Sequence, residues 1–226
     1  MPEPTPVLPE VLSQIRALPA SGRPLIICDV DEVILHLTTH LEDYLHSNGL
    51  MFLKYEYRLT GNIGSKKTGT SLNATEVKKL LMSFFDEVSP HQDLVPGADT
   101  ALHSLSDDWD VVLLTNLPGA HNKPVRENLL AAKGLNYPVL TNSGPKGGAV
   151  AALASGRPSP VVFIDDSPTN HNSVNASLPS SIQIQFIADP RFLTSMTREQ
   201  HVDLLTGDWQ ETETFISSIL SAAKTS

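Results

Sequence analysis

The sequence predicts an α/β protein built on a parallel β-sheet, and two observations indicate this class. Helical patterns alternate with apolar, β-rich runs at 25–30, 110–115, 138–141, 161–166 and 182–187. Such alternation is typical of parallel strands joined by helices that cover both faces of the sheet. In addition, the runs 25–30 and 161–166 are apolar without a break until they end in carboxylates, as expected of strands buried on both faces.

The predicted helices complete this alternation. A first helix runs from Pro9 to Leu18, because apolar residues recur there at helical spacing and proline suits a first helical turn. Helices near 98–106, 125–133 and 147–154 lie between successive strands. A last helix begins near Trp209, and we assign its apolar face to core packing.

The interval 36–95 breaks the alternation, since it is too long for one crossover. It predicts two helices, near 37–47 and 74–88, on either side of a polar stretch. Within that stretch, residues 60–70 are rich in turn formers and carry two lysines, so we expect a mobile loop able to gate a site. The predicted organisation is therefore a core domain formed by 1–35 and 96–226 and an inserted helical cap at 36–95.

Composition restricts the function. The chain has 226 residues, of which 40% are hydrophobic and 18% charged, which suits a globular protein with a full core. Its net charge is -9 and no Lys/Arg-rich run occurs, so a nucleic-acid partner is not expected. The first residues carry acid and prolines instead of a signal peptide, and no stretch approaches ~18 apolar residues. We expect a cytoplasmic protein with small-molecule partners and no membrane contact, and the oligomeric state is open.

Carboxylates end two of the predicted strands. Asp29 and Asp31 follow the first strand, and Asp165 and Asp166 follow the strand at 161–166. Carboxyl ends of parallel strands open onto one crevice, so we expect the two groups to meet. Desolvated like charges repel, which makes such a cluster costly unless a cation or phosphate chemistry requires it. Asp29 is then a candidate nucleophile that attacks phosphorus, and Asp31 a candidate proton donor to the leaving oxygen. The alternative is that both are turn residues at a strand end.

Other strand and helix ends add groups suited to a phosphate. Asp165 and Asp166 would complete an oxygen-rich site of the kind Mg²⁺ prefers. Thr115 and Asn116 place a hydroxyl and an amide where both can hold phosphate oxygens, with a capping role as the alternative. Lys146 opens a predicted helix, where anions are favoured, although a surface lysine is the ordinary case. The single cysteine, Cys28, is expected to be a buried strand thiol, with a catalytic thiol as the less favoured reading.

These groups form four motifs along the chain: Asp29 with Asp31, then Thr115, then Lys146, then Asp165 with Asp166. In this order and context they resemble the four motifs of the haloacid dehalogenase superfamily, over about residues 24–190. The resemblance implies a Rossmann-like sheet of five parallel strands in the order 5-4-1-2-3. It implies that Asp29 is nucleophile and metal ligand, and that Asp31 is general acid and also a metal ligand through its carbonyl. It further implies that Thr115 binds the phosphoryl group and that Lys146 neutralises the nucleophile and the phosphoryl. The remaining implied residues are Asp165 and Asp166 for Mg²⁺, with Asp166 the more direct ligand, and Asn170 at the polar position closing that motif.

The resemblance also implies a function. An insert between the first and second motifs is where small-metabolite phosphatases of this superfamily carry a type-one helical cap. The expectation is a Mg²⁺-dependent phosphomonoester hydrolase that forms a phospho-aspartate on a small phosphorylated metabolite. Asp31 argues against dehalogenation, because halide displacement needs no proton donor. The alternatives are a mutase that passes the phosphoryl group to a sugar hydroxyl, and a phosphate- and Mg²⁺-binding regulator without turnover.

Two features of the chain bear on specificity. Glu32-Val33 stands where many members of the superfamily have glycine-threonine, at the point where the chain turns toward the insert. No motif in the insert names a substrate. Its side chains that are candidates for reading one are Lys54, Tyr55, Tyr57, Arg58, Lys66 and Lys67.

Overall fold

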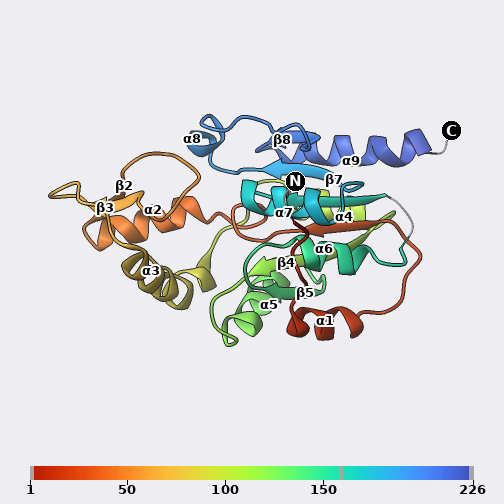
Figure 1. Ribbon diagram of the computed structural model, residues 1–226, viewed down its shortest axis with the longest axis horizontal. Coiled ribbons are helices and arrows are strands. Elements are labelled where there is room, and N and C mark those ends of the chain that lie inside the picture. Colours follow the sequence, from red (N-terminus) through yellow and green to blue (C-terminus); the bar gives the residue numbers. More distant parts are fainter. Residues whose placement is uncertain (1–2, 158–159, 224–226) are drawn as a thin grey trace.

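The main sheet is parallel and has the predicted order. The computed structural model describes residues 3–157 and 160–223, so Met1 and Pro2 of the proline-rich start lie outside the described residues (Figure 1). In the described part, six strands pair side by side in the order β5-β4-β1-β6-β7-β8, and every pairing is parallel. The strands are β1 (Leu25–Cys28), β4 (Asp110–Asn116), β5 (Val139–Asn142), β6 (Val161–Asp165), β7 (Ile182–Phe186) and β8 (Leu204–Thr206).

Counted along the chain, the first five of these strands confirm the order 5-4-1-2-3. The sixth, β8, was not predicted, and it extends the sheet beyond β7. Its three residues are too few to show a strand periodicity in the sequence.

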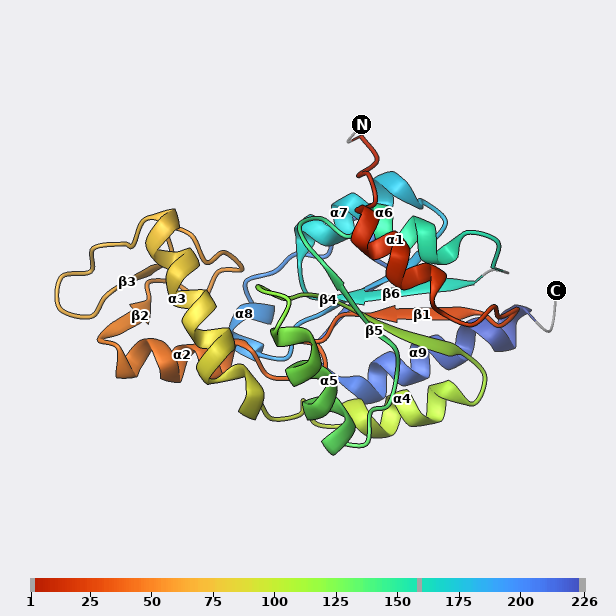
Figure 2. The same cartoon turned by 90° about the horizontal axis from the view of Figure 1, so that it is seen from below.

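Helices cover both faces of the sheet (Figure 2). One face carries α1 (Pro9–Arg16), α6 (Gly147–Ala154) and α7 (Pro168–Ser177), and the other carries α4 (Ala98–Ser106), α5 (Asn122–Ala132) and α9 (Trp209–Ala223). Each face has its own hydrophobic cluster, with Leu25 and Ile27 of β1 in one and Ile26 and Cys28 in the other. Because successive side chains of a strand point to opposite faces, a strand covered on both sides must be apolar throughout.

Two α-helices of the described chain were not predicted, namely α7 and the four-residue α8 (Pro190–Leu193). The segment that forms α7 is largely polar and shows no apolar stripe, so periodicity could not indicate it. In the described part of the chain, no helix combines the length and the apolarity needed to cross a membrane.

The insert lies beyond one end of the main sheet (Figure 1). Its two helices, α2 (Thr38–Ser47) and α3 (Ala74–Glu87), confirm the predicted ones, and a short 3-10 helix, η1 (Ser89–His91), follows α3. The polar stretch between them is not a plain loop: β2 (Leu50–Phe52) and β3 (Ile63–Ser65) form a small antiparallel sheet. The predicted loop at 60–70 therefore contains a strand.

The insert shares its hydrophobic core with a segment that follows β7. In α8 (Pro190–Leu193), the ring of Phe192 makes edge contacts with Phe52, Tyr55 and Tyr57 of the insert, at centroid distances of 5.4, 5.6 and 6.2 Å. Ile187 belongs to the same cluster. The insert thus packs against chain from the predicted core domain, and the division at 36–95 stays a prediction.

Candidate active site

The chain turns sharply after β1 and presents two carboxylates on one side. Val30 is fully buried in the core, so Asp29 and Asp31, one residue before and one after it, project together away from that core. The Asp29 N–H donates to the Ile164 carbonyl at 2.8 Å, which extends the pairing of β1 with β6 by one residue. This brings Asp29 beside the acids that end β6, and one oxygen each from Asp29, Asp165 and Asp166 lies within 4.8 Å of the others.

Lys146 joins these acids. Its ammonium lies 2.8 Å from Asp29 Oδ1 and 2.7 Å from Asp165 Oδ2, and its side chain is buried. A side chain on Gly147 would collide with α7, so the glycine lets α6 approach α7 closely and begin at this point. Burial lowers the pKa of Lys146, but Asp165 and Asp29 outweigh it and raise that pKa above its ordinary value. The lysine is therefore a fixed positive charge between two carboxylates.

The two acids after β6 differ in their partners. Asp165 Oδ1 accepts hydrogen bonds from the Ser167 N–H and the Asn170 amide, both at 2.9 Å, and Oδ2 accepts from Lys146. The Gln185 amide donates to the Asp166 backbone carbonyl at 3.1 Å, but the Asp166 carboxylate receives no hydrogen bond from another side chain within the described residues. Burial, followed by repulsion from Asp29 and Glu32, raises the pKa of Asp166 well above its usual range. Asp166 is thus the carboxylate left available for a cation.

Asp29 is also a buried carboxylate close to other charged groups. Burial raises its pKa, Lys146 opposes this and Asp165 adds to it, so that the pKa of Asp29 moves from 3.8 to about 7. Burial also raises the pKa of the neighbouring Cys28 well above its ordinary value. Cys28 lies in β1 with no solvent exposure, as predicted for a strand thiol, and its raised pKa disfavours the thiolate that catalysis would need.

The end of β4 supplies an unpaired hydroxyl. Thr115 is 1% exposed, and its Oγ1 has no hydrogen-bond partner within the described residues. A buried hydroxyl without a partner is costly, so Oγ1 is placed to bond an oxygen of a ligand. The Asn116 amide is largely engaged, because Oδ1 accepts from Asn142 and Nδ2 donates to the Gly144 carbonyl at 3.0 Å each. Asn116 thereby ties the loop after β4 to the loop after β5 and keeps one amide hydrogen free.

The solved structures that resemble this chain share one fold. A HAD family hydrolase from Deinococcus radiodurans R1, with bound phosphate and sodium, superposes with a TM-score of 0.60 at 11% identity, covering 88% of this chain and 97% of that one. The chain has the haloacid dehalogenase fold. The magnesium-bound structure of YfnB from Bacillus subtilis matches that fold with a TM-score of 0.54, 13% identity and coverage of 86% and 99%. The L-2-haloacid dehalogenase PA0810 gives 0.55, 12% and coverage of 86% and 100%.

No family model and no curated protein sequence matches the chain. At these identities the similarity establishes the haloacid dehalogenase fold alone. The solved structures include both a hydrolase with bound phosphate and a dehalogenase, so the chemistry has to be argued from the residues of this chain.

Within this fold, the surroundings of Asp31 come from residues that sequence reasoning missed. Arg126 Nη2 lies 3.0 and 3.2 Å from the two carboxylate oxygens of Asp31, and the Gln92 amide donates to Oδ1 at 3.0 Å. The same Nη2 also donates to the Ser89 hydroxyl at 2.6 Å. Arg126 and Gln92 are buried, yet nothing in the sequence separates them from the surface arginines and glutamines of an ordinary helix or turn.

Glu32 departs from glycine at a position whose backbone favours glycine. Its φ of 64° is the one positive value among the described residues other than glycine. Its buried carboxylate compensates, because Oε2 accepts from the N–H groups of Leu37 and Thr38 and Oε1 accepts from the Asp189 N–H. Glu32 thereby joins the start of α2 in the insert to the segment before α8.

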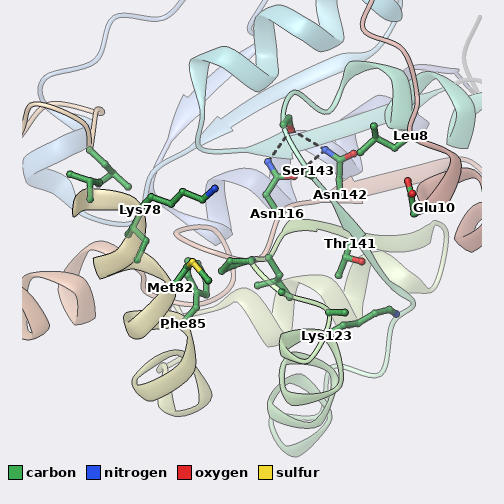
Figure 3. Close-up of a pocket in the computed structure, with 18 of the residues that line it drawn as sticks. Leu8, Glu10, Lys78, Met82, Phe85, Asn116, Lys123, Thr141, Asn142 and Ser143 are labelled. Carbon is green, nitrogen blue, oxygen red and sulfur yellow. Dashed lines mark hydrogen bonds between the residues drawn. The ribbon is translucent and has the colours of Figure 1, made fainter. Parts of the chain in front are cut away.

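A cavity of about 1150 Å³ lies between α3 and the loops after β4 and β5 (Figure 3). Asn116 and Gly144 are in its wall, so it begins one residue from Thr115 and two from Lys146. Of the six insert residues that the sequence suggested as substrate readers, Arg58 alone is among the lining residues. Tyr55 and Tyr57 instead pack on Phe192, as described above. The residues of α3 that line the cavity could not be identified from the sequence, since they form an ordinary amphipathic pattern.

Proposed function

We propose that the protein is a Mg²⁺-dependent phosphomonoester hydrolase that forms a phospho-aspartate at Asp29, with a small phosphorylated metabolite as substrate and the insert as a type-one cap. The observation that carries this proposal is the gathering of Asp29, Asp166 and Lys146 after β1, next to β4, whose Thr115 hydroxyl has no partner within the described residues. Phosphate and magnesium bound in structures of the same fold support it.

The acids fit a divalent cation. Mg²⁺ takes oxygen ligands, and Asp29 and Asp166 offer carboxylate oxygens within 4.8 Å of each other. Asp165 belongs to the same group, but its oxygens already accept three hydrogen bonds, so we assign it to holding Lys146 and Asn170. The Asp31 carbonyl would complete the protein ligands. The ion supplies positive charge that offsets negative charge building up on the phosphoryl oxygens.

The residues of the chain divide the work of two displacements. In the first, a carboxylate oxygen of Asp29 bonds to phosphorus as the ester P–O bond breaks, and Asp31 gives a proton to the departing oxygen. In the second, Asp31 takes a proton from water, which attacks phosphorus and releases phosphate from Asp29. Lys146 offsets the charge of Asp29 and the phosphoryl group, while Thr115 Oγ1 donates a hydrogen bond to a phosphoryl oxygen. Cap closure would exclude bulk water during the first step.

The test is a screen of phosphorylated metabolites, reading phosphate release with Mg²⁺ and with a chelator. Asp29→Asn keeps the shape of the side chain and removes the nucleophile, so turnover should be lost. Asp108→Asn is the matched control, because Asp108 is exposed in the turn before β4. Turnover by Asp29→Asn equal to that of the wild type would refute the assignment.

The same screen separates the alternatives. A mutase would move the phosphoryl group to an added sugar hydroxyl and release little free phosphate. A regulator without turnover would bind phosphate and Mg²⁺ and release nothing. Retention of both Asp29 and Asp31 favours catalysis, because binding alone does not require both aspartates.

A further inference from the structure

The cavity beside the phosphate site gives the substrate a chemical class. We propose that it holds the organic part of the substrate, and that this part combines an apolar body with a second anionic group, remote from the reacting phosphate. The inference rests on the proposed function, because it takes the phosphate ester to lie at Asp29. The cavity wall is continuous in sequence with that site, since Asn116 follows Thr115 and Gly144 precedes Lys146 by two residues.

An apolar body is indicated by α3, which turns Leu81, Met82 and Phe85 toward the cavity. Met82 is 46% exposed, the highest value of the three exposed large hydrophobic side chains within the described residues. Figure 3 shows Met82 and Phe85 side by side on the wall formed by α3. Apolar area removed from water is favourable by about 25 cal/mol per Å², so a ligand with apolar surface would gain affinity here.

A second anion is indicated by positive charge on the same wall. Lys78 extends from α3 across the cavity toward Asn116 (Figure 3), and no acid or carbonyl pairs with its ammonium within the described residues. Arg58 lines the cavity as well, and its Nε donates to the Thr60 carbonyl while no carboxylate pairs with it in the described part of the chain. The third cation, Lys123, is already neutralised by Glu127 at 2.7 Å. Glu10 is the one acid among the described residues that line the cavity, so Lys78 and Arg58 leave the wall with a net positive charge, which favours an anionic ligand group.

The opposite wall and the size fit the same class. Asn116 and Asn142 end β4 and β5 and, with Ser143, give this wall a polar surface, although both amides are largely bonded to each other and to the Gly144 carbonyl. The volume of about 1150 Å³ lies just above the usual range of ligand sites, which runs from about 300 to 1000 Å³. A phosphate ester of two or three carbons would leave most of this space to water, whereas a larger organic group such as an aryl body would occupy more of it.

The experiment uses phosphonates, which are not hydrolysed, so it reads binding independently of turnover. Dissociation constants of methylphosphonate, benzylphosphonate and 4-carboxybenzylphosphonate are measured by calorimetry with Mg²⁺ present. We expect the benzyl compound to bind at least tenfold more tightly than the methyl compound. The carboxylate should then add about a further fivefold, as one partly exposed charge pair does.

Variants of α3 show which lysine accounts for the gain in affinity from the carboxylate. Lys78→Met keeps the length of the side chain and removes its charge, so the gain from the carboxylate should disappear while the gain from the benzyl ring remains. Lys79→Met is the matched control, because Lys79 is the next residue on α3, is exposed and does not line the cavity. A probe with a second phosphonate in place of the carboxylate tells which anion the site prefers.

The outcomes are separable. Equal affinity for the three phosphonates, or equal loss in Lys78→Met and Lys79→Met, would overturn the inference even if the protein releases phosphate from a metabolite. Selective binding that depends on Lys78, in a protein that hydrolyses no ester, would support the cavity assignment and refute the proposed hydrolase.

Discussion

The two aspartates of the first motif stand two residues apart and lie in different surroundings. Asp29 meets groups delivered by strand and helix ends, namely Lys146 and the acids after β6. Asp31 meets Arg126 from the middle of α5 and Gln92 from the turn after η1. The Asp29 side of the site follows from the sheet, because parallel strands deliver their carboxyl ends to one edge. The Asp31 side depends on how one helix and one turn pack, which the sheet does not dictate.

The substitution with the largest expected effect is Lys146→Met, which tests how the Asp29 side of the site is held. It leaves Asp29 and Asp165 as buried carboxylates without their shared cation, and breaking a buried ion pair costs about 3–5 kcal/mol. We expect that loss in the free energy of unfolding, measured in urea, together with loss of the proposed phosphatase activity. Lys79→Met is the surface control. An unfolding free energy unchanged by Lys146→Met would mean that the Asp29 side is not held by this lysine.

The pH dependence of stability tests the same side. Burial, opposed by Lys146, raises the pKa of Asp29 from 3.8 to about 7. Between these values the folded protein binds a proton that the unfolded chain has released, so stability should fall as the pH rises through that window. The slope is at most about 1.4 kcal/mol per pH unit for one group.

Asparagine provides the reference for that measurement, because it does not titrate. Urea unfolding of the wild type and of Asp29→Asn, from pH 4 to 8 in the presence of a chelator, gives the difference in stability. The wild type should lose stability relative to the variant as the pH rises, and Mg²⁺ should reduce the loss by stabilising the carboxylate. A difference that stays constant with pH would contradict the raised pKa.

These tests show why the sequence predicts the two sides unequally. Unbroken apolar runs that end in polar side chains are visible without coordinates, and so the residues at the ends of β1, β4 and β6 could be predicted. The strand order of the sheet was predicted from the resemblance to the haloacid dehalogenase superfamily and not from these runs. Arg126 lies in a polar helix, where periodicity places it no better than any surface arginine. The sequence of α3 likewise does not predict the cavity wall. An amphipathic pattern shows which residues are apolar, but it does not show which of them remain exposed in the folded protein.

Arg126→Lys sharpens the comparison on the Asp31 side. Lysine keeps the charge, but its ammonium sits on a flexible chain in place of the planar guanidinium that fixes Nη2 between Asp31 and the Ser89 hydroxyl. We expect kcat to fall about 10- to 100-fold with KM little changed, because in the proposed mechanism Asp31 acts on the reacting atoms and does not bind the organic part of the substrate. The cost in stability should be about 2 kcal/mol.

Arg157→Lys is the control for that change, since Arg157 pairs with Asp110 at the opposite end of β4, away from the site. Steady-state kinetics of both variants on one substrate decide the point. An equal fall of kcat in the two variants would mean that Arg126 acts only by stabilising the fold. A rise in KM at constant kcat would instead assign Arg126 to substrate binding.

Glu32→Gln gives the smallest effect and tests how the insert is held. The buried carboxylate accepts from the N–H groups of Leu37, Thr38 and Asp189, and an amide would turn its own N–H₂ toward at least one of these donors. We expect a loss of about 1 kcal/mol in unfolding free energy, as for one lost buried hydrogen bond. Because Leu37 and Thr38 begin α2, amide hydrogen exchange should increase at the start of α2 and remain unchanged in β4. Uniform exchange in both segments would show that Glu32 stabilises the whole fold and has no special part in fixing the insert.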